Sequence, residues 1–173
     1  MSIDAALRPS QPTPTLRIAR SFDDIVGCLS VRLVVFVGEQ EVPLDEEVDA
    51  YDADATHYCC VLDGHVVGTA RLVLLERGWG KIGRVAVLRP YRRRGIATAL
   101  MRRILDHEAS ALSLVTLDAQ VTAIGFYERF GFVAEDDVFM DAGIPHRRMV
   151  LKRRQEDGAP EGAPCGSNVG KLL

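Results

Sequence analysis

Residues 85–100, with the sequence VAVLRPYRRRGIATAL, constrain the fold of this chain more than any other stretch. The apolar start, Val85 to Val87, predicts the end of a buried strand. From Ile96 onward, apolar residues recur at positions i and i+4, as they do on one face of an amphipathic helix. The first N–H groups of a helix have no partners within it, and the helix dipole is positive there. The stretch therefore predicts an anion site where the helix begins.

The loop before this helix has the chemistry that a phosphate group requires. Gly95 and Ala97 have little or no side chain, so the main-chain amides can approach an anion closely. Arg92, Arg93 and Arg94 add positive charge at the same place. A Walker loop would need a lysine after the glycine, and the dinucleotide fingerprint would need three spaced glycines, so neither motif fits. The physical interpretation is a cradle for a diphosphate.

A second motif follows at residues 123–132, with the sequence AIGFYERFGF. It predicts a short helix that ends at Gly131, a residue suited to the left-handed cap of a helix. Together, Arg92-x-x-Gly95-x-Ala97 and the Phe-Tyr-Glu-x-x-Gly-Phe element resemble the two hallmark motifs of the GNAT superfamily of acetyl-CoA-dependent N-acetyltransferases. Residues 35–43 and 143–149 resemble the ElaA-like branch of that superfamily, and the whole resemblance covers residues 16–152.

The resemblance implies the GNAT acyl-CoA N-acyltransferase fold, an α/β fold whose mixed, mostly antiparallel sheet of about seven strands is flanked by about four helices. The pattern of residues predicts a helix at 22–32 with Ser21 as its N-cap, followed by a second helical piece at 33–39. It predicts a hairpin closed by Asp63-Gly64, and Gly83 is expected to mark a bulge or a close approach of the backbone. Strands are predicted at 16–19, 58–62, 65–75, 81–87, 114–120, 133–139 and 145–152.

Acetyl-CoA is the co-substrate that the resemblance implies, with no metal. The cradle supplies Arg92, Arg93, Arg94, Gly95, Ile96, Ala97 and Thr98. The resemblance adds the main chain of Val85, Ala86 and Val87 for the peptide-like pantetheine arm, which can pair with an open strand edge. Gln120 stands where the family commonly has Asn, and it is a further candidate to hydrogen-bond the cofactor or the acceptor.

Transfer by direct attack of an amine on the thioester needs a proton donor for the departing sulfur and an acceptor for the proton of the amine. The resemblance assigns the general acid to Tyr127, which is protonated at neutral pH. The base candidates are Glu39, Glu46, Glu47, His57 and His146, acting directly or through water. No covalent acyl-enzyme is required, so a nucleophilic role for Cys59 or Cys60 is not expected.

An acidic stretch lies between Arg32 and Arg71, a segment without lysine or arginine. One interpretation is a wall of the acceptor site, whose field attracts a cationic amine. The other is a solvated loop, which is what charge runs usually form. The acidic residues from 39 to 54 are Glu39, Glu41, Asp45, Glu46, Glu47, Asp49, Asp52 and Asp54.

Composition limits the alternatives. A net charge of -3 over 173 residues provides no basic field for nucleic acid or anionic lipid, and no apolar run reaches the length of a membrane span. The cysteines form no Cys-x-x-Cys pair, which favours reduced thiols and a cytoplasmic location. We expect a flexible leader at 1–14, the catalytic domain at 15–152 and a disordered tail at 153–173.

Two other functions compete with acetyl transfer. A module of the same fold could bind acyl-CoA for regulation without transferring the acyl group. A nucleic-acid module could use the arginines of the cradle and its helix, but the interleaved aromatic residues of such modules are missing. The expected partner is a small-molecule or peptide amine, cationic in character, and a homodimer is a possible assembly.

Overall fold

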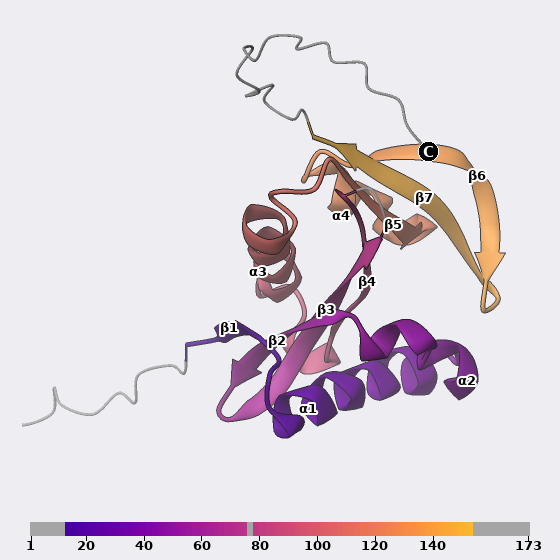
Figure 1. Ribbon diagram of the computed structural model, residues 1–173. Coiled ribbons are helices and arrows are strands. Elements are labelled where there is room, and N and C mark those ends of the chain that lie inside the picture. Colours follow the sequence, from indigo (N-terminus) through magenta and orange to yellow (C-terminus); the bar gives the residue numbers. More distant parts are fainter. Residues whose placement is uncertain (1–12, 76–77, 154–173) are drawn as a thin grey trace, which may run out of the picture.

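A computed structural model describes residues 13–75 and 78–153 of the chain (Figure 1). Apart from positions 13, 14 and 153, the predicted leader and tail lie outside the described residues. Seven strands form one sheet in the order β1-β2-β3-β4-β5-β7-β6, in which only the β4–β5 pair is parallel. The strands are β1 (Thr15–Ile18), β2 (Thr56–Leu62), β3 (His65–Leu75), β4 (Trp79–Val87), β5 (Leu114–Gln120), β6 (Val133–Asp141) and β7 (Ile144–Lys152).

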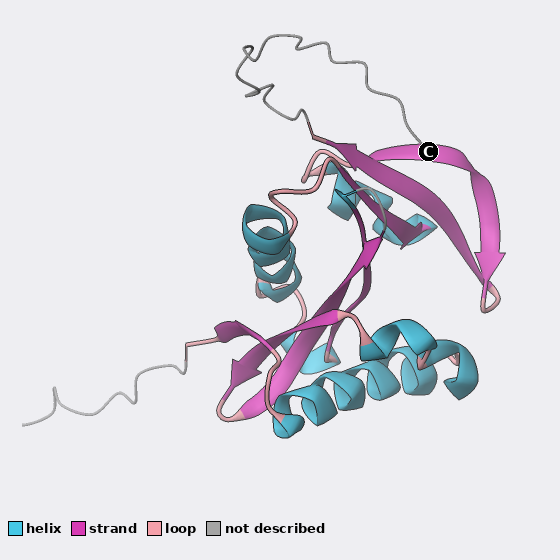
Figure 2. Cartoon of the chain, viewed as in Figure 1, coloured by secondary structure: helices cyan, strands magenta, loops and turns pink. Residues whose placement is uncertain are grey.

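Helices cover both faces of this sheet (Figure 2). Helix α1 packs on β2 and β3 from one side, while α3 packs on the same strands from the other. A π-type turn at Leu33–Glu39 extends α1, and a similar turn at Ile104–Glu108 extends α3. The predicted α/β fold is therefore confirmed. The α-helices in the described part of the chain are α1 (Phe22–Arg32), α2 (Leu44–Glu47), α3 (Ile96–Arg103) and α4 (Ile124–Glu128).

Local sequence signals account for several of these elements. The Ser21 hydroxyl accepts a hydrogen bond from the Asp24 N–H at 3.1 Å, which caps α1 as predicted. Asp63 and Gly64 have φ of 50° and 78°, the positive values that a two-residue hairpin turn requires. Cys59 and Cys60 point to opposite faces of β2, and each is buried under a different helix layer.

Helix α3 and the turn that extends it are anchored by the apolar side chains that the i, i+4 pattern predicted to be buried. Ile96, Leu100, Met101 and Ile104 are all at most 5% exposed and lie in the main core. Burying each of them stabilises the fold by about 1.5–3 kcal/mol. The loop before α3 is therefore attached to one of the most firmly packed elements of the protein.

The sheet opens between β4 and β5. Their pairing covers only Trp79 to Lys81 opposite Leu114 to Thr116, and beyond these residues the strands diverge (Figure 1). The β3–β4 register shifts between Thr69 and Arg71 just beyond this point, so β4 carries a bulge. The bulge predicted at Gly83 is centred one residue further on, at Arg84, whose φ is 53°.

The C-terminal boundary of the domain differs slightly from the prediction. Arg153, assigned to the tail, donates its main-chain N–H to the Ser113 carbonyl oxygen at 2.9 Å. Its guanidinium donates to the Leu105 carbonyl oxygen at 2.8 Å. These contacts attach Arg153 to the domain.

Candidate active site

The loop from Arg92 to Gly95 borders a cavity of about 560 Å³, here called the cradle cavity. Gly95 has φ of 80°, and a Cβ atom built on it would meet no atom within 4 Å. The first hydrogen bond of α3 joins the Ala99 N–H to the Gly95 carbonyl oxygen, which leaves the preceding amides at the helix start for an anion. The lining comprises Val85, Val87, Tyr91, Arg92, Arg93, Gly95, Ile96, Ala97, Thr98, Phe126 and Arg129.

Most of the predicted cofactor residues meet at this cavity, but they do not all play the same part. The Arg92 guanidinium donates to the Val87 carbonyl oxygen at 2.8 Å and to the Glu39 carboxylate at 2.7 Å. Arg94 stacks on the Tyr91 ring at 5.6 Å and is not among the lining residues. Ala86 is buried against the α1 side of the sheet, so only its main chain could meet a ligand.

Sequence reasoning missed three side chains of the cradle cavity, those of Tyr91, Phe126 and Arg129. The Arg129 guanidinium lies 5.2 Å from the centre of the Phe126 ring, and both residues belong to the second motif. Their i, i+3 spacing in a predicted helix was the available signal, because it places both side chains on one face. Arg129 adds a cation at the far side of the cavity from the arginine loop.

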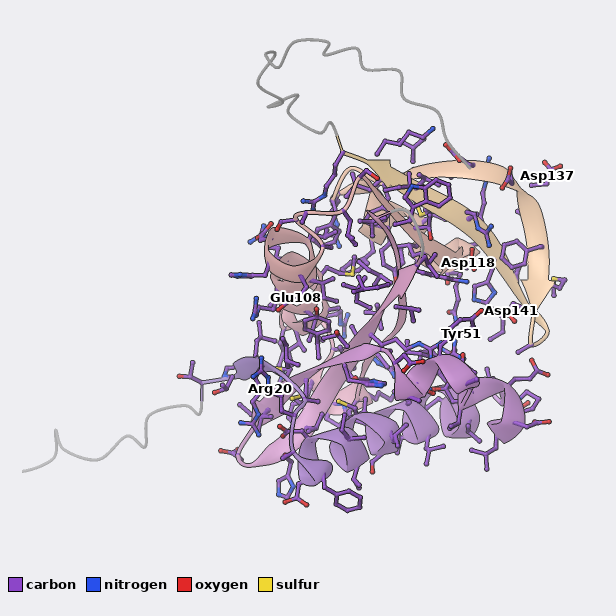
Figure 3. All side chains as sticks on the ribbon, viewed as in Figure 1. Arg20, Tyr51, Glu108, Asp118, Asp137 and Asp141 are labelled. Carbon is purple, nitrogen blue, oxygen red and sulfur yellow. The ribbon has the colours of Figure 1, made fainter. Side chains whose placement is uncertain are left out.

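A second cavity, of about 220 Å³, occupies the opening between β4 and β5 and is here called the inter-strand cavity. Its walls come from residues 36–47, which include α2, and from β4, β5, α4 and the β6–β7 hairpin. Val85 is the one residue that lines both cavities within the described part of the chain. Asp118 and Asp141 both lie on the inner side of the β6–β7 hairpin (Figure 3). The two cavities therefore meet at the bulge of β4.

Tyr127 lines the inter-strand cavity, with its ring edge against Phe126 and Phe132. Burial raises the pKa of Tyr127 to about 12, because the phenolate would lose hydration. The hydroxyl is therefore protonated throughout the neutral range. A partly buried, protonated phenol can donate a proton to a group in this cavity.

His146 lines the same cavity from β7, where it pairs with Gln120 of β5. Its Nδ1 lies 2.9 Å from the Ile144 carbonyl oxygen, which can only accept a hydrogen bond. This contact assigns the proton of the neutral ring to Nδ1, so the lone pair is on Nε2. His146 is thus set up as a proton acceptor.

Of the other base candidates, the exposed Glu46 lines the same cavity, whereas Glu39, Glu47 and His57 are less available to a ligand. The Glu47 side chain is 2% exposed, with ion pairs to Arg32 at 2.5 Å and Arg84 at 2.9 Å. Glu39 is paired with Arg92 at 2.7 Å. His57 is 5% exposed, hydrogen-bonds the Asp52 carbonyl oxygen and lines neither cavity.

Half of the acidic stretch, Glu39, Glu47, Asp49 and Asp52, is paired with arginines from outside it. Arg32 and Arg71 both hydrogen-bond Asp52, and Arg71 also contacts Asp49. Burial would raise the pKa of Asp52, but the hydrogen bonds from the two arginines outweigh it and hold that pKa well below its usual range. Neither a one-sign field nor a solvated loop describes this paired half of the stretch. It is a folded wall held by ion pairs.

Two polar contacts cross the opening of the sheet. At its closed end, Lys81 of β4 forms an ion pair with Asp118 of β5 at 2.7 Å. At its open end, the Gln120 amide donates to the Gln40 side-chain oxygen at 2.8 Å. Gln120 therefore lies at the mouth of the inter-strand cavity rather than in the cradle.

Residues 13–75 and 78–153 contain no group of three or more His, Cys, Asp or Glu side chains placed to hold a metal ion. In the same part of the chain, no helix is long and apolar enough to cross a membrane.

Comparison with solved structures defines the class of protein. An acyl-CoA N-acyltransferase from Pseudomonas aeruginosa is 32% identical with a TM-score of 0.70, over 80% of this chain and 98% of that one. Escherichia coli ElaA is 26% identical with a TM-score of 0.69, over 82% of this chain and 99% of its own. The fold with an opened sheet is thus that of acyl-CoA N-acyltransferases.

Sequence comparison names the family. A model of the acetyltransferase (GNAT) family matches residues 22–132. YjcF of Bacillus subtilis, described as an uncharacterized N-acetyltransferase, is 34% identical over 135 residues, which cover 77% of this chain and 96% of YjcF. The chain belongs to the GNAT family of N-acetyltransferases, as its two motifs predicted.

Proposed function

We propose that the protein transfers the acetyl group of acetyl-CoA to a primary amine by direct attack within a ternary complex. The observation that carries this proposal is the junction at Val85, where the cradle cavity and the inter-strand cavity meet. A thioester bound by its diphosphate in one cavity can present its carbonyl carbon to an amine in the other. No covalent acyl-enzyme is needed, and Cys59 and Cys60 are buried away from both cavities.

The cradle fits the diphosphate of coenzyme A. The amides at the start of α3, the left-handed Gly95 and the arginine loop supply donors and positive charge in one place. Arg92 would exchange its contact with Glu39 for the phosphate, while its bond to the Val87 carbonyl keeps the side chain in position. The main chain of Val85 to Val87 would then pair with the amides of the pantetheine arm.

Proton transfer is assigned to two side chains of the inter-strand cavity. His146 accepts the proton of the attacking amine at Nε2, directly or through a water molecule. Tyr127 donates its hydroxyl proton to the sulfur as the C–S bond breaks, and its raised pKa keeps that proton available. Glu47 and Glu39 would need to leave their arginine partners to act as the base, which ranks them below His146.

The acceptor is proposed to be a small-molecule or peptide amine with cationic character. Support comes from two cavity-lining carboxylates, Glu46 and Asp141, for which the described residues provide no ion pair. Asp118 and Glu47 are already neutralised, so the attraction is local rather than a field of the whole acidic stretch. A cytoplasmic location and a homodimer remain predictions.

The test combines calorimetry with an activity assay. Acetyl-CoA added to the pure protein should bind with a measurable heat, and a panel of amines should yield free thiol only in the presence of a matching acceptor. Binding without transfer to any amine would favour the silent acyl-CoA-binding module. Absence of binding would refute the proposal.

A further inference from the structure

The bulge of β4 has a feature that acetyl transfer by itself does not explain. Arg84 adopts a positive φ of 53°, a conformation that residues with a Cβ atom rarely adopt. Gly83 pairs with Arg71 and Ala86 pairs with Thr69, so two residues of β4 lie opposite one residue of β3. Glycine would be the easier choice at the strained position, which indicates that the arginine side chain is needed there.

The Arg84 side chain is held by the acidic stretch at residues 39–54, here called the acceptor wall. The Arg84 guanidinium donates to the carbonyl oxygens of Glu46 at 2.9 Å and Glu47 at 3.1 Å, both in α2. It also forms ion pairs with the Glu47 carboxylate at 2.9 Å and with Asp49 at 3.2 Å. One side chain therefore joins the bulge of β4 to both the main chain and the carboxylates of the wall.

The wall is in turn fixed to α1. Arg32 is 1% exposed, and its guanidinium donates to the Glu47 carboxylate at 2.5 Å and to the Glu47 carbonyl oxygen at 2.6 Å. Glu47 is thus held between Arg32 and Arg84. Since buried charges are stable only when paired, displacement of α2 would leave charged groups without partners. The wall and the bulge are expected to keep a fixed separation.

The contact between Arg84 and the acceptor wall lies next to the place where acetyl transfer is proposed to occur. The bulge lies just beyond the last β4–β5 pair, at Lys81 and Thr116, and it includes Val85, which lines both cavities. The main chain at 83–85 therefore borders the place where the acyl group and the amine must meet. A small displacement of reacting groups at such a place lowers the rate strongly without affecting distant binding contacts.

We infer that Arg84 is a positioning residue, which sets the distance between the acyl-binding main chain of β4 and the acceptor wall formed by α2. This inference rests on the proposed acetyl transfer. Arg84 takes no proton and is not required to touch either substrate. Its contribution is geometric, and it should appear in turnover rather than in affinity for acetyl-CoA.

The test compares Arg84→Gly with Arg84→Ala. Glycine tolerates the positive φ, so Arg84→Gly keeps the bulge and removes only the side-chain contacts. We expect both variants to lower kcat by about tenfold or more, while the Kd for acetyl-CoA measured by calorimetry stays within about threefold of wild type. Arg84→Lys retains the charge without the fork of donors, so its kcat should lie between that of wild type and that of the two other variants.

Two controls separate positioning from loss of stability. Asp52→Asn breaks contacts of Arg32 and Arg71 in the same wall but does not touch Arg84, so it should lower the melting temperature and leave kcat within about twofold. Arg20→Ala removes an exposed arginine that lines neither cavity and should change nothing. A wild-type kcat in Arg84→Gly, or an equal loss in Asp52→Asn, would overturn the inference.

Hydrogen exchange provides a measurement that needs no turnover. Arg84→Gly should speed amide exchange at both 44–47 and 83–85, whereas Asp52→Asn should spare 83–85. Unchanged exchange in Arg84→Gly would overturn the positioning role even if the wild-type protein transfers acetyl groups. Coupled exchange in a protein that transfers nothing would refute the proposed function and leave the coupling between wall and bulge standing.

Discussion

The two cavities that meet at Val85 are built in different ways. The cradle cavity takes most of its lining from one continuous stretch, residues 85–98, and its anion site consists mainly of main-chain amides. The inter-strand cavity is assembled from four separate parts of the chain, and its polar groups are side chains. Binding through the main chain tolerates changes of sequence, whereas a site made of side chains can change its ligand without a change of fold. A shared co-substrate suits the first kind of site and a variable acceptor suits the second.

This difference predicts that binding and turnover can be separated by substitution. Of the described residues that line the cavities, only Val85 is common to both. Variants in the inter-strand cavity should lower kcat, and variants in the cradle should weaken acetyl-CoA binding. An inter-strand variant that weakens acetyl-CoA binding, or a cradle variant that lowers kcat, would show that the two cavities do not act separately.

The largest effect is expected for Tyr127→Phe. Loss of a general acid lowers kcat by about 10²–10⁴-fold, while the Kd for acetyl-CoA should stay unchanged because the cradle is intact. Since the pKa of Tyr127 is raised to about 12, its proton should cause no loss of wild-type activity between pH 7 and pH 10. Steady-state kinetics and calorimetry measure the two quantities. An unaltered kcat would remove Tyr127 from the mechanism.

The stability of the folded protein should depend on pH through Asp52. Its pKa is lowered in the folded protein because the hydrogen bonds from Arg32 and Arg71 outweigh the opposing effect of burial. The stabilisation is therefore fully present above the unfolded pKa of about 4, and it is lost as the pH falls through the lower folded value. At pH 7, Asp52→Asn should reduce the free energy of unfolding by about 3 kcal/mol.

Urea unfolding at several pH values measures this effect. The difference between Asp52→Asn and wild type should shrink as the pH is lowered from 7 toward 3, because the Asp52 carboxylate of the unfolded chain takes up a proton in that range while the folded one stays ionised. Asp54→Asn is a matched control, since Asp54 is exposed and forms no ion pair with the described residues. A difference that stays constant with pH would show that Asp52 acts through packing instead of charge.

The contrast between the cavities also explains what could be predicted from sequence. The cradle was predictable because Arg92, Gly95 and Ala97 are close in the chain, and local geometry fixes how a strand passes into a helix. The bulge was placed within one residue for the same reason. A β-branched apolar run likewise placed β5 at its observed bounds, since a buried strand depends on its own residues.

The inter-strand cavity was not predictable in the same way, since its contacts join residues far apart in the chain. Arg84 and Glu47 are separated by 37 positions, and no local pattern relates them. The acidic stretch looked like a one-sign field because its arginine partners lie outside it. Only folding brings Arg32 and Arg84 to Glu47 and Arg71 to Asp49. The charge balance of the wall is therefore a property of the tertiary structure.

A moderate effect on binding is expected for Gly95→Val. The φ of 80° strains any residue with a Cβ atom, and a β-branched side chain adds bulk at the amides that start α3. The Kd for acetyl-CoA should rise by about tenfold or more, with kcat at saturation changed little. Gly64→Val is a control for the strain alone, because Gly64 has φ of 78° in a hairpin turn away from both cavities. Unaltered affinity in Gly95→Val would contradict the cradle.

The smallest effect belongs to Arg129, which lies across the cradle cavity from the arginine loop and stacks on Phe126. Because this guanidinium is exposed, its attraction for an anion is screened by water and salt, so Arg129→Ala should raise the Kd for acetyl-CoA only about threefold to fivefold. Most of that difference should vanish at 0.5 M salt, and kcat should not change. Arg102→Ala, an exposed arginine of α3 outside both cavities, should bind as wild type does. A lowered kcat in Arg129→Ala would mean that a side chain of the cradle cavity influences the reacting groups. That result would contradict the separation of cofactor binding in one cavity from turnover in the other.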